Sequence, residues 1–174
     1  MQRVALLAGA MAVVVLPGCG PAKPAEAGEV VPELKLEQVQ FRVWRGTDLR
    51  VEGEARVATL RRDSTELRAT DLVAVQPRED GPAVIRAPRG QGFLRTRVFT
   101  AEGGVTLEHG SDVGRTPSAR YVPDGGGRIT GEEALVVEGR GYRLQGTGFE
   151  LDPGSGELHM HGRPHLVAGL PGAR

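Results

Sequence analysis

A short β-strand pattern recurs along the chain at intervals of about 31 residues, and this repetition constrains the fold more than any other feature. Each copy contains an extended strand, a turn and a short strand with an apolar pair. The copies are anchored at Leu67, Val98, Ile129 and Leu158, which are separated by 31, 31 and 29 residues. A period of this size is typical of stacked repeats, in which neighbouring units complete one continuous core.

The final copy is the most regular and predicts a β-hairpin. Tyr142, Leu144, Phe149 and Leu151 are spaced so that their side chains fall on one face of a pleated strand. The segment 152–156, which reads Asp-Pro-Gly-Ser-Gly, supplies the turn before the alternation resumes.

Composition favours an all-β domain over residues 34–168. The 26 Gly and 12 Pro among 174 residues suit many short turns and are too many for a helical bundle. We expect residues 46–48 and Gly53 to mark turns. Prolines are expected only in turns or at edge strands. The prolines in question are Pro77, Pro82, Pro88, Pro117 and Pro123.

The first 18 residues are expected to be a secretory signal peptide. Arg3 precedes an apolar run over residues 4–16, which is too short to span a bilayer. The run ends in Leu-Pro-Gly-Cys, which resembles a bacterial lipobox and implies cleavage before Cys19 and lipidation of its sulfur. Residues 20–33 have the small, Pro-rich composition of a flexible linker, and residues 169–174 are expected to be a disordered tail.

Several chemistries are excluded or disfavoured. The net charge of zero gives no field for nucleic acid, and one cysteine cannot form an intrachain disulfide. Residues 154–156 do not complete a nucleophile elbow, and no glycine-rich phosphate loop occurs. Glu132 and Glu133 are adjacent and are expected to be solvated loop charges. We therefore expect no enzyme activity and no cofactor.

The histidines leave one alternative open. His159 and His161 would share one strand face, and His165 or His109 could add a third ligand for zinc. Leu158 and Met160 occupy the opposite, apolar phase, which favours a solvated position for the two histidines and no metal site.

The closing segment, which reads Gly-x-Gly-Phe-Glu-Leu-Asp-Pro-x-Ser-Gly-Glu-Leu, resembles the LptC family of lipopolysaccharide export proteins. The resemblance covers residues 34–167 and is strongest over 119–167. The same unit occurs in the related LptA and in the amino-terminal part of LptD. Unlike the best-known LptC proteins, which keep an uncleaved transmembrane helix, this leader looks cleavable, so the resemblance is to a lipoprotein variant of LptC or an LptA-like relative.

This resemblance implies a twisted, open β-jellyroll of two antiparallel sheets whose apolar interior receives lipopolysaccharide acyl chains. The expected groove residues are Phe41, Val43, Leu49, Val51, Val73, Ile85, Val98, Leu107, Tyr121, Ile129, Tyr142, Leu144, Phe149, Leu151, Leu158 and Met160. The expected partner-docking edge contains Leu158, His159, Met160, His161, Leu166 and Val167.

The implied function is a non-enzymatic periplasmic bridge that receives lipopolysaccharide from an inner-membrane ABC transporter and passes it to an LptA-like partner. The implied partners are therefore lipopolysaccharide, the transporter permeases and the next jellyroll protein. The anchor is expected in the inner membrane, with the outer membrane as the alternative. A structural or adhesive surface lipoprotein without a groove and a metal-dependent periplasmic enzyme are the competing hypotheses.

Acylation of Cys19 is directly testable. A clickable fatty-acid analogue supplied to growing cells should label the wild-type protein and should not label Cys19→Ser, because the thiol is the only acceptor of its kind in the chain. Equal label in both proteins would contradict the lipoprotein hypothesis.

Overall fold

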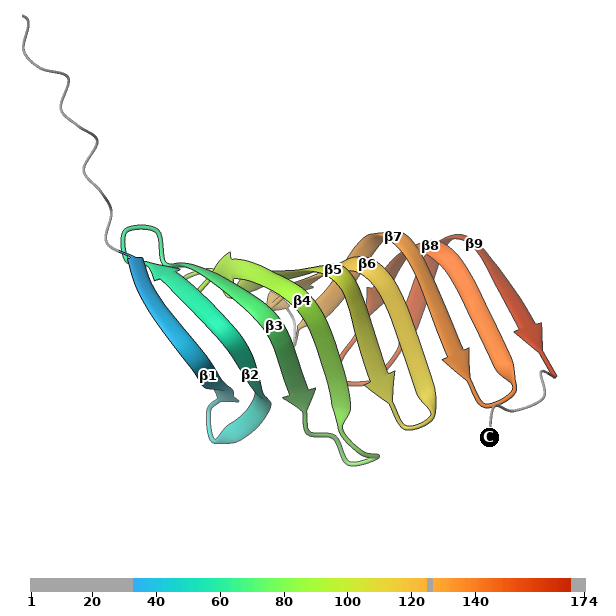
Figure 1. Ribbon diagram of the computed structural model, residues 1–174. Helices are drawn as coiled ribbons and strands as arrows, with labels where there is room; N and C mark the ends of the chain where they lie inside the picture. The colour runs from blue at the N-terminus through green and yellow to red at the C-terminus, as the bar shows by residue number, and fades with distance from the viewer. Residues whose placement is uncertain (1–32, 125–126, 170–174) are drawn as a thin grey trace, which may run out of the picture. The chain divides into compact units, whose positions relative to one another are not determined.

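The structure is a computed structural model that describes residues 33–124 and 127–169. The predicted signal peptide, Cys19 and the predicted linker up to residue 32 lie outside the described residues, as does the predicted tail from residue 170. Nine antiparallel strands form a single sheet (Figure 1). The strands are β1 (Glu33–Arg45), β2 (Asp48–Arg61), β3 (Glu66–Gln76), β4 (Ala83–Phe93), β5 (Val98–His109), β6 (Asp112–Val122), β7 (Arg128–Gly139), β8 (Tyr142–Leu151) and β9 (Leu158–Ala168).

Every strand pairs with its neighbours in the sequence, so the strand order is β1 through β9 and the sheet is open, with β1 and β9 at its edges. The all-β prediction is confirmed. Glu33, which was assigned to the linker, is the first residue of β1. In the described part of the chain, no helix is long and apolar enough to cross a membrane.

The predicted repeat corresponds to one hairpin, because every second strand begins close to an anchor position. Leu67, Ile129 and Leu158 lie in one hydrogen-bonded row of the sheet, but the position in β5 is taken by Phe99. The anchor Val98 was therefore placed one residue too early, and its side chain belongs to the opposite face.

One apolar row crosses all nine strands at the end of the sheet where β2 turns into β3. The paired residues are Leu34, Leu60, Leu67, Gly92, Phe99, Tyr121, Ile129, Leu151 and Leu158. The row beside it, one residue away in each strand, is polar throughout. It contains Lys35, Thr59, Arg68, Gln91, Thr100, Arg120, Thr130, Glu150 and His159. Because neighbouring residues in a strand point to opposite sides, the sheet has one apolar face and one polar face.

A second apolar row crosses all nine strands near the other end of the sheet. It contains Phe41, Gly53, Ala74, Ile85, Leu107, Gly114, Val137, Leu144 and Leu166. Both rows belong to the apolar face. In β2, Ala55 and Ala58 are both buried although strict alternation would place residues three apart on opposite sides. A Cβ atom built at Gly90 in β4 would lie 3.2 Å from Leu72 Cδ2 in the middle of the neighbouring strand β3. The Leu72 side chain therefore lies on the same face as Gly90.

The two rows share a face because the strands are interrupted in the middle, along what we call the break line. Left-handed backbone conformations occur there at Gln38, Asp71, Gly103, Gly104 and Gly148. The pairing register also shifts mid-strand in five consecutive pairs, from β4–β5 to β8–β9. Each interruption resets the alternation, so apolar side chains return to the same face.

The break line corrects the expectation for two prolines. Pro88 and Pro117 lie inside the central strands β4 and β6, not in turns or at edges. Both fall at register shifts, between Arg86 and Arg89 and between Arg115 and Arg120. A proline lacks a donor for the ladder and is tolerated at a bulge, where pairing is already interrupted.

Aromatic rings on the apolar face lie over glycines of the neighbouring strand. A Cβ atom at these glycines would collide with the ring, so the absence of a side chain makes room for the aromatic group. The strand pairs are Phe41 over Gly53, Phe99 over Gly92, Phe149 over Gly131 and Tyr142 over Gly139. Gly53 is therefore an interior residue of β2, and its expected position in a turn was wrong.

These glycines give a stability test. Gly53→Ala should lower the free energy of unfolding by about 1–3 kcal/mol, because its Cβ would overlap with the Val73 carbonyl oxygen and the Phe41 ring. Gly114→Ala is the matched control in the same apolar row, since its nearest neighbours would be at an ordinary 3.7 Å. Urea unfolding should show this control within about 1 kcal/mol of wild type. Equal losses would contradict the packing role of Gly53.

Candidate functional site: the apolar face

The apolar face is only partly covered by the protein itself. The buried hydrophobic residues are Ala55, Ala58, Ala83, Ala87, Val105, Leu135 and Phe149, and no side chain in the described ranges is fully buried. Most large residues of the two apolar rows are half-buried, and at the sheet edges Leu34 and Leu166 are 47% and 61% exposed. The protein's own side chains therefore leave much of this face accessible.

Fourteen of the sixteen predicted groove residues share the apolar face, by direct pairing or by alternation from a paired residue. They are Phe41, Val43, Leu49, Val51, Ile85, Leu107, Tyr121, Ile129, Tyr142, Leu144, Phe149, Leu151, Leu158 and Met160. The other two, Val73 and Val98, lie on the polar face. Val73 pairs with Glu54 and Arg86 on the polar face, because the interruption at Asp71 resets the alternation of β3.

Several residues of the apolar face were missed. Leu60, Phe99 and Val137 lie in the two rows but were not among the expected groove residues. Phe99 could have been found from its spacing to Ala101, which continues the alternation along the first half of β5. Val137 lies beyond a register shift in β7, and a strict two-residue period does not carry across it.

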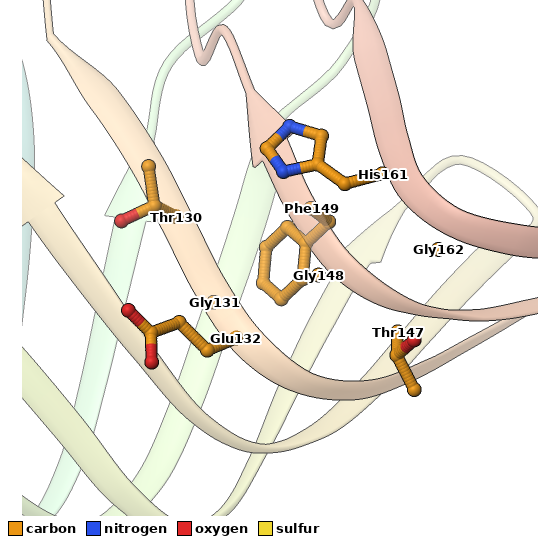
Figure 2. A pocket seen from close by; sticks show the side chains of 8 residues that line it. All are labelled: Thr130, Gly131, Glu132, Thr147, Gly148, Phe149, His161 and Gly162. Carbon is orange, nitrogen blue, oxygen red and sulfur yellow. The ribbon is translucent and has the colours of Figure 1, made fainter.

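Two open hollows lie along the break line between β7, β8 and β9. The larger, about 580 Å³ in volume, is lined by Thr130, Gly131, Glu132, Thr147, Gly148, Phe149, His161 and Gly162. Figure 2 shows Phe149 in the middle of these side chains, with Glu132 and His161 on either side of its ring. A second hollow of about 300 Å³ adjoins it and includes Leu135 and Gly146. Glycines are three of the eight residues that line the larger hollow and two of the nine that line the smaller one.

Glu132 and Glu133 are exposed, as predicted, but they lie within strand β7 and not in a loop. They occupy the register shift between Gly131 and Ala134, where both side chains reach solvent. The Ser118 hydroxyl donates a hydrogen bond of 3.0 Å to Glu133 Oε2, which ties β6 to β7 across the shift.

Two side-chain hydrogen bonds connect parts of the sheet that are far apart in strand order. Gln76 Nε2 and Arg78 Nη1, at the end of β3 and after it, donate to the Pro153 carbonyl oxygen at 2.9 and 3.1 Å. Pro153 lies in the turn between β8 and β9 and is buried. In a flat sheet, five strand spacings would separate β3 from β8 by about 24 Å. The sheet is therefore not flat, and we call this connection the clasp.

Asp80 supports the clasp from the other side of Arg78. Arg78 Nε donates to Asp80 Oδ1 at 3.2 Å, and His109 Nε2 lies 3.2 Å from the same oxygen. Desolvation acts to raise the pKa of Asp80, but hydrogen bonds from Arg78, the backbone and His109, with the Arg78 charge, hold this pKa below its ordinary value. A carboxyl group whose pKa is lower in the folded state stabilises the fold at pH values above its unfolded-state pKa. This stabilisation is lost as the pH falls through the folded-state pKa. The support from Asp80 is thus present at neutral pH.

The histidines do not gather around one point. His159 lies on the polar face, 64% exposed, with Nε2 3.2 Å from Glu157 Oε1, whereas His109 faces Asp80. Over the residues that the structure describes, no three His, Cys, Asp or Glu side chains form a group that could hold a metal ion.

Asp112 on β6 and Tyr142 on β8 form a polar pair beside the second apolar row. Burial raises the pKa of the Tyr142 phenol, and a hydrogen bond with Asp112 and the charge of Asp112 raise it further. The neutral phenol therefore persists at physiological pH, and it provides a donor beside the apolar face.

The two edge strands carry most of the exposed large hydrophobic residues. These are Leu34, Leu36, Val43 and Trp44 on β1, and Leu166 and Val167 on β9. All six residues of the predicted docking edge lie on β9, which has one neighbouring strand in the described sheet. An edge strand with unpaired backbone groups is a template for strand addition.

No protein-family model matches the chain, and no curated protein matches it. The likeness to the LptC family therefore rests on the sequence pattern given above.

The clasp predicts unequal effects for two arginines. Arg78→Ala should destabilise the fold by about 1.5–3 kcal/mol and speed amide exchange at residues 154–156, because its side chain is 14% exposed and bonds to a buried turn. Arg86→Ala is the control, since its 3.9 Å ion pair with Glu108 is about half exposed and contributes at most about 1 kcal/mol. Unchanged exchange in Arg78→Ala would show that the clasp does not hold the turn.

Proposed function

We propose that the protein is a non-enzymatic lipid-transfer bridge. It receives lipopolysaccharide from an inner-membrane ABC transporter and passes the acyl chains along the apolar face to an LptA-like partner. The observation that supports this most strongly is the pair of apolar rows that cross all nine strands on one face while no side chain there is fully buried. Such a face gains stability when another apolar group removes it from water.

We also propose that the two halves of the sheet act as the two layers of an open jellyroll. The break line supports this, because it keeps both apolar rows on one face while interrupting each strand in the middle. The clasp gives further support, since it joins the end of β3 to the turn after β8. Acyl chains would then lie between the halves, against both rows.

The direction of the rows suits transfer from one protein to the next. Each row runs across the strands for eight spacings of about 4.8 Å, or roughly 38 Å, and ends on β1 and β9. The end residues Leu34 and Leu166 are exposed. A partner that adds a strand at either edge would lengthen both rows without a gap, so a lipid could move on without returning to water.

The free energy of binding expected for this face suits the transfer of a lipid more than its storage. Burial of apolar surface contributes roughly 25 cal/mol per Å², and part of this offsets the entropy lost when a lipid is bound. A half-covered face therefore provides moderate affinity over its whole length. In this proposal Cys19 anchors the domain in the membrane, and the permeases and the LptA-like partner dock at opposite edges.

A photo-crosslinking pair on β7 tests the proposal. The purified full chain, carrying p-benzoylphenylalanine at position 129 or 130, would be irradiated with lipopolysaccharide. Both Ile129 and Thr130 are half-buried, but they belong to the apolar and the polar row respectively. Crosslinking at 129 should exceed that at 130 at least tenfold.

Two results would contradict the proposal. Equal crosslinking at both positions would mean that lipopolysaccharide does not distinguish the two faces. No crosslinking at either position would favour the alternative, a structural or adhesive surface lipoprotein in which the apolar rows serve only as internal core.

A further inference from the structure

Two turns at one end of the sheet are joined into a single projecting unit, which we call the tip. It consists of residues 61–68 around the β2–β3 turn and residues 93–98 around the β4–β5 turn. Leu94 N donates to the Thr65 carbonyl oxygen at 3.0 Å, and Arg97 N donates to the Phe93 carbonyl oxygen at 2.8 Å. The first bond joins the two turns, and the second closes the β4–β5 turn on itself.

The tip exposes two large apolar side chains that do not lie on an edge strand. Phe93 and Leu94 are 45% and 46% exposed, and the other six exposed large hydrophobic residues of the described chain lie on β1 and β9. Phe93 ends a central strand and pairs with Val98, which also belongs to the polar face. An apolar spot thus interrupts the polar face at the end of β4, where the chain turns into β5.

The tip that carries the apolar spot also has an excess of positive charge. The tip holds five arginines and two carboxylates, Asp63 and Glu66, and both carboxylates are already paired with arginines of the tip. The other three arginines are Arg62, Arg95 and Arg97, and within the described ranges none of them forms an ion pair. The turns at the other end of the sheet, residues 45–48, 76–83, 109–112 and 138–143, hold four arginines and five carboxylates. Positive charge is therefore local to the tip, although the whole chain is neutral.

We propose that the tip docks on an anionic lipid bilayer, with Phe93 and Leu94 in the interfacial layer and Arg62, Arg95 and Arg97 against lipid phosphates. Exposed aromatic and aliphatic side chains beside arginines are the combination that inserts at a membrane surface. Each basic residue near an anionic surface strengthens binding by about fivefold. This inference does not depend on lipid bound to the apolar face. It assigns one end of the strands to the bilayer.

A fluorescent probe at each end of the sheet tests the inference. In the full chain with Cys19→Ser, which removes the only cysteine, an environment-sensitive dye would be attached at Thr96→Cys in the tip or at Ser111→Cys in the β5–β6 turn. Both positions are exposed and lie at opposite ends of the strands. The proteins would be mixed with phosphatidylcholine vesicles, with or without phosphatidylglycerol, that carry a lipid-linked quencher.

The dye at position 96 should shift to the blue and be quenched on vesicles with phosphatidylglycerol, whereas the dye at position 111 should stay in water. Adding Arg95→Gln and Arg97→Gln should raise the lipid concentration for half-maximal quenching about tenfold or more. Phe93→Ser with Leu94→Ser should abolish the blue shift. Circular dichroism and urea midpoints would verify that each variant has the parent fold before comparison.

Three outcomes would overturn the inference. A dye at position 96 that remains in water on all vesicles would leave an acidic protein as the better partner for the tip. Equal quenching at positions 96 and 111 would mean that the amino-terminal apolar run alone holds the chain at the vesicle. Quenching that does not respond to phosphatidylglycerol or to the arginine substitutions would remove the electrostatic basis of the docking.

Discussion

The structure depends on one constraint, which is that a nine-stranded sheet with a single apolar face has no separate layer to cover it. Strands with regular alternation of apolar and polar residues would leave this face flat and fully exposed to water. The break line provides a local solution, because left-handed residues, glycines and prolines interrupt the strands and reset the alternation. Both apolar rows then remain on one face while the sheet departs from flatness. The clasp between the β3–β4 loop and Pro153 holds this shape with polar contacts at the rim, not with apolar packing.

The constraint also explains which parts of the fold could be predicted from the sequence. Turn chemistry and alternation were sufficient for the last hairpin, where the Asp152 side chain accepts from Gly154 N and Ser155 N as a turn of this sequence requires. The repeat length was also informative, since two antiparallel strands and their turns occupy a nearly constant number of residues. These features are local, and a local pattern is visible in a single sequence.

The errors arise where one strand depends on another. Val73 looks apolar and correctly spaced, but the left-handed Asp71 places it on the polar face. Gly53 resembles a turn residue in the sequence. A glycine is needed there because the Phe41 ring, on the neighbouring strand and twelve residues away, occupies the space of a side chain. Pro88 and Pro117 appear to exclude a central strand unless the bulge beside them is known. The periodicity and composition of the sequence therefore predict the number and kind of strands. They predict less well on which side of the sheet each residue lies.

The three surfaces of the described sheet suggest a division of roles. The apolar face is suited to acyl chains, the edges β1 and β9 to strand addition, and the tip to an anionic bilayer. The polar face carries ion pairs such as Arg115–Glu138 and Arg143–Glu138, whose side chains are about half exposed to solvent. The activity proposed above depends on the shape of the sheet and on the burial of apolar surface.

The central claim is that acyl chains bind the apolar face, and methyl NMR with a spin-labelled fatty-acyl lipid tests it most directly. Leu60, Ile129 and Leu151 on the apolar face and Val84, Val113 and Val136 on the polar face are all half-buried, so the two sets differ mainly in the side of the sheet they occupy. Our account predicts strong broadening of the Leu and Ile methyl resonances and little effect on the Val set. Equal broadening of both sets, or none in either at saturating lipid, would contradict it.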